Sequence, residues 1–155
     1  MSSIDWTEFL DFSNIATFSV DLLLTLVIGF ILGYERHLAG KIMGARSTMI
    51  LIIGSFLFTY ASLRVGVDHG RVIAQIVTGV GFIGAGIIFK KGDRDIINLT
   101  TAILVWTVAA LGVLVGLGLR AEAIIASIVV FVVLRLARNK WFPKNSHGKD
   151  EKEGE

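Results

Sequence analysis

Five apolar stretches separated by short polar segments make up most of this chain. They cover residues 18–34, 47–63, 72–89, 101–119 and 121–136. A helix needs about 20 apolar residues to cross the hydrocarbon core of a bilayer, with about 17 as the lower limit. The first four stretches meet that limit, and the fifth is shorter and ends with Arg135, whose side chain can reach the interface. The pattern predicts an all-α, polytopic membrane bundle of about five transmembrane helices.

Composition agrees with that class and excludes others. The mean hydropathy is +0.72 and 54% of the residues are hydrophobic, both above the range of soluble domains. The chain has no cysteine, which excludes disulfides, thiolate metal ligands and thiol catalysis. Its basic residues gather at particular loops and form no continuous basic face, so we expect no nucleic-acid partner.

The distribution of basic residues predicts the orientation. Basic residues collect on the cytoplasmic side of membrane proteins. With five spans and the N-terminus outside, the outer segments hold Arg64, Arg71 and Arg120, and the other twelve of the fifteen Lys and Arg residues lie inside. We therefore expect an N-out, C-in, multi-pass protein of the bacterial cytoplasmic (inner) membrane.

The ends differ from the membrane part. Residues 1–16 mix acidic and aromatic residues, which is typical of an interfacial segment. Residues 17–141 form the expected transmembrane domain. Residues 142–155 are polar and show no periodicity, so we expect a disordered cytoplasmic tail.

Glycines are dense in the third and fourth stretches. Small residues at helical spacing let membrane helices pack backbone against backbone. The glycines predicted to form such contacts are Gly79, Gly81, Gly84, Gly86, Gly112 and Gly116. A broken-helix ion site is the alternative for so glycine-rich a helix. The string from Gly79 to Gly84 also fits a dinucleotide fingerprint, but it lies inside an apolar span with no preceding strand, so we expect no cofactor.

One carboxylate lies well inside a predicted span. Asp21 is in the first stretch, and Arg71 and Gln75 begin the third stretch from the same side of the membrane. A rise of about 1.5 Å per residue places the three at similar depth. Because an intramembrane carboxylate must be paired, protonated or hydrated, we predict an Asp21–Arg71 pair with Gln75 nearby. The alternative is that Asp21 is hydrated near the outer surface.

A second polar group is expected at the cytoplasmic end. Glu35, Arg36 and Arg46 flank the loop between the first two spans, and Thr100 and Thr101 open the fourth, with Asn98 as its expected cap. A helix N-terminus beside arginines can receive a phosphate or a lipid headgroup. Ordinary capping and membrane anchoring are the alternative.

Catalytic groups are poorly represented. Ser47 has no histidine or lysine at a helical spacing that would activate it, and no second buried carboxylate accompanies Asp21. His37, His69 and His147 are scattered rather than spaced as metal ligands. We therefore expect neither an enzyme nor a metal centre.

Three blocks of the chain resemble the MgtC/SapB family of membrane proteins. Glu35-Arg36 with Ala39-Gly40 and Arg46 matches the first block, and the run from Leu99 to Ala102 with Trp106 matches the third. The second and most specific block is matched at Arg71, Ala74, Gln75, Gly79, Gly81, Phe82, Gly84, Ala85 and Gly86. Asp21 also occupies a family position, whereas Asn98 stands where the family usually has glycine.

The resemblance implies a function. It points to a bacterial inner-membrane regulatory or adaptor protein linked to growth at low magnesium or to virulence, acting through other membrane proteins in the lipid bilayer. The alternative is transport of Mg²⁺ or another ion or small solute, which the family's older magnesium label suggests. A homo-oligomer such as a dimer is a further expectation. We expect no counterpart of the C-terminal soluble domain that the MgtC-like branch carries, so the chain resembles the short, SapB-like branch.

Overall fold

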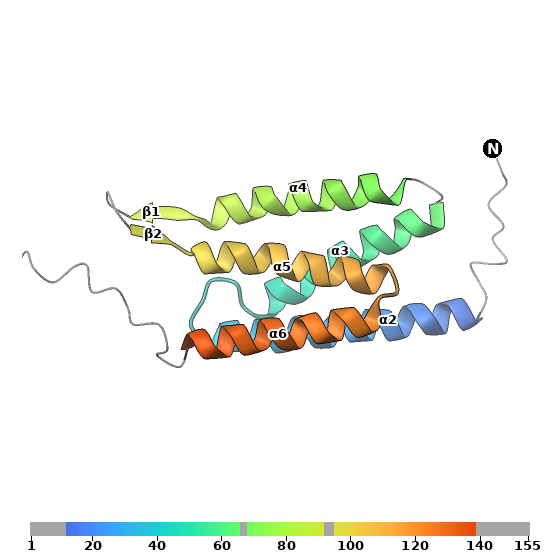
Figure 1. Ribbon diagram of the computed structural model, residues 1–155, viewed down its shortest axis with the longest axis horizontal. Coiled ribbons are helices and arrows are strands. Elements are labelled where there is room, and N and C mark those ends of the chain that lie inside the picture. The colour runs from blue at the N-terminus through green and yellow to red at the C-terminus, as the bar shows by residue number, and fades with distance from the viewer. Residues whose placement is uncertain (1–11, 66–67, 92–94, 139–155) are drawn as a thin grey trace, which may run out of the picture.

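The computed structural model describes residues 12–65, 68–91 and 95–138. These ranges contain five helices, as predicted, and one short hairpin (Figure 1). The helices are α2 (Phe12–Leu38), α3 (Ala45–Val65), α4 (His69–Ile87), α5 (Leu99–Gly116) and α6 (Arg120–Arg138). By length and composition, α2 to α5 are apolar enough to cross a membrane. α6 differs because its 19 residues include Arg120, Glu122, Arg135 and Arg138.

The helices run along a common direction (Figure 1). α4 lies at one edge of the bundle, α2 and α6 lie at the other, and α3 and α5 lie between them. α3 packs mainly against α2 and α5, whereas α4 packs mainly against α5. The order of the helices around the bundle therefore separates α2 and α6 from α4.

Two glycines make the tight turns between neighbouring helices. Gly40 follows α2 with a φ of 64°, and Gly118 follows α5 with a φ of 78°. Glycine adopts this left-handed conformation without the steric cost that a Cβ imposes. The N–H groups of Gly118 and Leu119 then donate to carbonyl oxygens of the last turn of α5. This arrangement closes the predicted hairpin between the last two helices.

The charged segment after α4 forms a β-hairpin rather than an irregular loop. β1 (Phe89–Lys91) and β2 (Asp95–Ile97) pair antiparallel, with Phe89 opposite Ile97. The third apolar stretch was expected to stay helical to residue 89, but α4 ends at Ile87 and Ile88 is already extended. β-branched and aromatic residues on both sides of the loop favour the extended conformation.

The expected end segments are only partly covered. Residues 12–16 are continuous with α2 and do not form a separate element. Residues 1–11 and the expected tail, 142–155, lie outside the described residues.

Candidate functional site

α3 is enclosed by helix backbones on two sides. A Cβ added at Gly112 or Gly116 of α5 would lie 2.9 Å from Ser55 Cβ or 2.7 Å from Thr59 Cβ. On the α2 side, a Cβ at Gly33 would lie 2.6 Å from Ala45 Cα. Real Cβ atoms essentially never approach this closely, so these positions require glycine.

Two further glycines make close contacts with α3 although they were not predicted to do so. Gly29 and Gly33 of α2 both pack against α3. Their four-residue spacing is a Gly-x-x-x-Gly pattern, which is the usual signature of close helix contact in membranes. The signal was therefore present in the sequence, in the first apolar stretch.

The predicted glycines of α4 behave differently from those of α5. A Cβ at Gly84 would lie 3.5 Å from the Ala102 carbonyl oxygen, which is ordinary contact. A Cβ at Gly79, Gly81 or Gly86 would have nothing within 4 Å. Within the described residues of one chain, these three glycines do not form the expected packing contact, because α5 covers only the Val80–Gly84 side of α4.

The buried hydroxyl groups of α3 bond to the helix itself. Thr48 Oγ1 donates to the Gly44 carbonyl oxygen at 2.9 Å, and Thr59 Oγ1 donates to that of Ser55 at 2.9 Å. Ser55 and Ser62 donate in the same way to carbonyl oxygens of the preceding turn. These bonds satisfy the hydroxyl donors inside an apolar bundle and leave small side chains facing the glycines.

Asp21 pairs with Arg120, so the predicted Asp21–Arg71 pair is wrong. Asp21 is 5% exposed, and its two oxygens accept from Arg120 Nε at 2.5 Å and Nη2 at 3.1 Å. This two-point geometry is the strong form of an arginine–carboxylate contact. The depth estimate placed Asp21 at the correct end of the bundle, but α6 lies beside α2 there and α4 lies at the opposite edge (Figure 1).

Arg71 and Gln75 are exposed on α4. The Arg71 backbone N–H donates to Asp68 Oδ1 at 3.3 Å, as the cap of α4. A second contact at the Asp21 end joins α2 to α3, where Arg64 Nη2 donates to Asn14 Oδ1 at 3.3 Å. The Arg64 guanidinium also lies 5.0 Å from the centre of the Tyr60 ring. The polar residues at this end therefore fasten α2 to its neighbours.

The polar cluster predicted for the cytoplasmic end is smaller than expected. Glu35 and Arg36 are buried, with 3% and 5% of their surfaces exposed. Arg36 Nη2 donates to Thr101 Oγ1 at 3.1 Å, which connects α2 to the start of α5. Arg36 Nε is buried with no hydrogen-bond partner among the described residues. Arg46 and Thr100 are exposed and do not join this group.

Asn98 occupies the N-cap position of α5 but does not cap it by its side chain. Its backbone is left-handed, with a φ of 67°, and its side-chain Nδ2 donates to the Ile87 carbonyl oxygen at 3.3 Å. Asparagine tolerates this conformation better than most residues. The left-handed backbone gives a physical reason for the glycine that the family usually has at this position.

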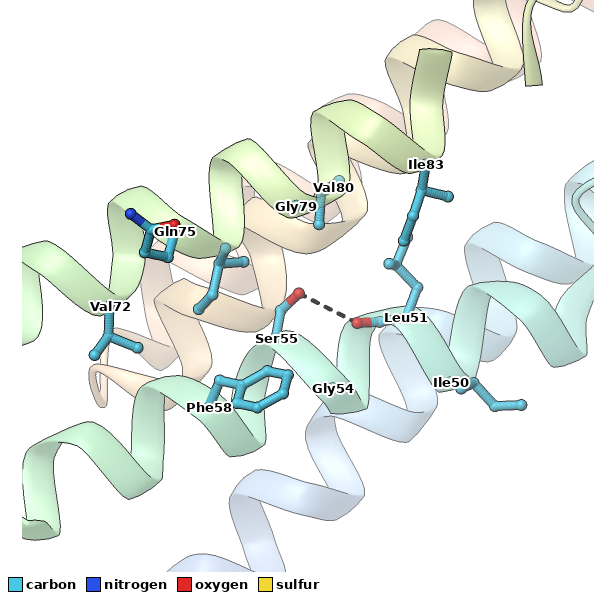
Figure 2. A pocket seen from close by; sticks show the side chains of 11 residues that line it. Ile50, Leu51, Gly54, Ser55, Phe58, Val72, Gln75, Gly79, Val80 and Ile83 are labelled. Carbon is cyan, nitrogen blue, oxygen red and sulfur yellow. Dashed lines mark hydrogen bonds between the residues drawn. The ribbon is translucent and has the colours of Figure 1, made fainter. Parts of the chain in front are cut away.

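An apolar groove of about 500 Å³ lies between α3 and α4. Figure 2 shows Gly54, Ser55 and Phe58 of α3 on one side, with Gln75, Gly79 and Ile83 of α4 on the other. The Ser55 hydroxyl is bonded to the Leu51 carbonyl oxygen, so the Gln75 amide is the main polar group at the groove. The described residues contain no group of three or more His, Asp and Glu side chains that could hold a metal ion.

These helices and buried polar contacts define a multi-pass helical membrane protein. The MgtC family model matches residues 22–140, and the chain belongs to that family. No solved structure matches the chain.

Several proteins are similar to this chain in sequence. The chain is 36% identical to the putative magnesium transporter YhiD of Escherichia coli, over 85% of this chain and 67% of that protein. It is 40% identical to protein MgtC of Brucella abortus, over 72% of this chain and 48% of the relative. It is 35% identical to protein MgtC of Salmonella typhimurium, over 77% and 52% of the two chains. The chain therefore spans between about half and two thirds of the length of these relatives.

Proposed function

We propose that this chain is a regulatory or adaptor protein of the bacterial inner membrane, without enzymatic activity, that serves adaptation to low magnesium or virulence through contacts with other membrane proteins. The observation that carries the proposal is the closed interior of the bundle. The apolar positions between Asp21 at one end and Glu35 at the other are filled by side chains and helix backbone.

The filling residues come from α2, α3 and α5. Ile28, Leu32, Ile52, Phe56, Val108 and Leu111 are all buried and form one cluster. Mg²⁺ requires hard oxygen ligands and sheds its waters reluctantly. A path between α3 and α5 would have to separate these helices at Gly112 and Gly116, where the backbones touch. The groove between α3 and α4 is lined by apolar residues, Ser55 and Gln75, and the described residues that line it include no carboxylate to bind Mg²⁺. This arrangement favours a binding role over conduction.

Other observations support the cellular setting. The basic residues favour an N-out, C-in orientation in a bacterial inner membrane. The names of relatives connect the family with magnesium.

Transport remains the second candidate because of one specific observation. The E. coli relative carries the name putative magnesium transporter, and Asp21 supplies a buried carboxylate. If several chains together formed a path, their Asp21 side chains could contribute ligands to it.

Flux and growth measurements separate the two functions. Purified protein in liposomes is expected to pass no more Mg²⁺ than protein-free liposomes, whereas the same protein should restore growth at low magnesium to a strain that lacks it. Restored growth without flux supports the regulatory role. Flux that is lost in Asp21→Asn would overturn it in favour of transport.

A further inference from the structure

α4 carries a line of residues that the other described residues leave uncovered. Gln75, Gly79, Phe82 and Gly86 follow one another at spacings of four, three and four, which places them along one side of the helix. All four are exposed. α4 lies at the edge of the bundle, away from α2 and α6 (Figure 1). We call these four residues the α4 seam.

Phe82 is the protruding residue of the α4 seam. It is 82% exposed, the largest value among the large hydrophobic residues in the described part of the chain. The seam residues on either side of it are Gly79 and Gly86, and a Cβ added at either would have nothing within 4 Å. An aromatic ring thus stands between two positions where the helix backbone is uncovered. This shape fits a helix that offers the same ring and the same two gaps.

We propose that the α4 seam binds a second copy of this chain, with the two α4 helices parallel around a twofold axis along the membrane normal. Such an axis brings each residue to its own counterpart at the same depth. The Phe82 ring of one copy then packs over the partner's Gly79 and the partner's Gly86. Close approach at glycines is the usual way that membrane helices associate.

The polar residues of α4 are also complementary to themselves. An amide group both donates and accepts, so Gln75 can bond to its own counterpart across the axis. Asp68 and Arg71 are exposed at the start of α4 and carry opposite charges three residues apart. In the parallel pair the partner's Asp68 lies about one turn from Arg71, so it can pair with Arg71 and offset the repulsion between the two Arg71 side chains. A lipid acyl chain on the same face would offer the Gln75 amide no hydrogen-bond partner.

The α4 seam borders the groove between α3 and α4, since Gln75 and Gly79 belong to both (Figure 2). The second copy of α4 would close one side of that groove. This proposal does not depend on whether the protein regulates or transports.

Cysteine cross-linking in native membranes tests the contact. The chain has no natural cysteine, so each single variant reports one position without background. Gln75→Cys and Phe82→Cys are expected to form covalent dimers on oxidation. Val77→Cys is the matched control, because Val77 is 43% exposed on the opposite side of the same helix, and it should stay monomeric.

Two glycine variants test the packing. Gly79→Leu and Gly81→Leu both add a side chain where the chain itself leaves space, but only Gly79 lies on the α4 seam. Gly79→Leu is expected to weaken dimerisation of the purified protein at least tenfold without lowering its Tm, and Gly81→Leu should leave dimerisation unchanged. Equal cross-linking at residues 77 and 82, equal effects of the two leucines, or cross-links to a different protein would each overturn the proposal.

Discussion

The α5 surface that contacts α3 and the outward side of α4 both carry glycines at helical spacing in an apolar helix. Their surroundings are opposite. Gly112 and Gly116 lie against the backbone of α3, whereas a Cβ added at Gly79 or Gly86 would meet nothing within 4 Å among the described residues. Both pairs repeat at helical spacing in an apolar helix. The difference shows that glycine spacing alone does not say whether another helix of the same chain lies against the glycines.

The largest loss of stability is expected at Gly112, in the contact between α5 and α3. Gly112→Leu should prevent stable folding, because even its Cβ would collide with the Ile52 carbonyl oxygen of α3. Gly112→Ala should cost about 1–3 kcal/mol, the usual range for overpacking. Thermal unfolding of the detergent-purified protein measures both. The control, Gly81→Ala, should be stabilising by up to about 1 kcal/mol through helix propensity. Equal losses at residues 81 and 112 would remove the distinction between the covered and open glycines.

The next effect compares a charged pair that is packed between helices, Asp21 with Arg120, with a charged residue on the open side of α4. Arg120→Gln should lower the Tm more than Asp21→Asn, because it leaves a buried carboxylate unpaired, whereas Arg120 is partly exposed and can reach water. The double variant should recover part of the loss. Arg71→Gln, on the open side of α4, should change the Tm little. A double-mutant cycle measures this coupling, and strictly additive losses would show that Asp21 and Arg120 do not interact.

A smaller effect is expected at the threonines. Thr101→Val removes the acceptor of Arg36 and leaves a buried guanidinium short of a partner, which should cost about 1–3 kcal/mol. Thr78→Val is the control on α4, where the hydroxyl is exposed and bonds only to the preceding turn. It should stay within about 0.5 kcal/mol of the parent. Chemical or thermal unfolding compares the two, and equal losses would count against the Arg36–Thr101 contact.

The smallest effect lies at the junction between the regions, where Asn98 connects the hairpin to α5. Asn98→Ala should cost about 1 kcal/mol, because alanine is strained at a positive φ. Asn98→Gly should be milder, since glycine relieves that strain although it loses the bond to Ile87. Unfolding of both variants checks the order, and a more harmful glycine would mean that the side-chain bond outweighs the backbone conformation.

The helices could be predicted because a membrane helix needs a long apolar run. The second stretch, predicted as 47–63, appears as Ala45–Val65, and the third to fifth also agree to within about three residues at each end. The first, predicted as 18–34, is longer, because α2 covers Phe12–Leu38. The depth of a side chain also follows from the number of residues along the helix. This is why Asp21 could be assigned to the end of the bundle where Arg120 lies.

The neighbours of each helix could not be predicted in the same way. Hydropathy does not determine the order of helices around a bundle, and Arg71 and Arg120 are equivalent by depth alone. Arg120 was assigned to a loop, although it begins α6. Gly29 and Gly33 did carry a readable spacing. By contrast, the hydrogen bond from Asn98 to Ile87 depends on how the hairpin returns to α4, which no local pattern specifies.

The covering of α3 by α5 also affects how the chain is made. The ribosome synthesises α3 and α4 before α5, so the surface of Ser55 and Thr59 meets lipid until Gly112 and Gly116 have entered the bilayer. The hydroxyls of Ser55 and Thr59 bond to carbonyl oxygens of their own helix, so their donors are satisfied even while they face lipid. α3 can therefore enter the membrane with α2 already beside it and acquire its second main neighbour, α5, only late in biosynthesis.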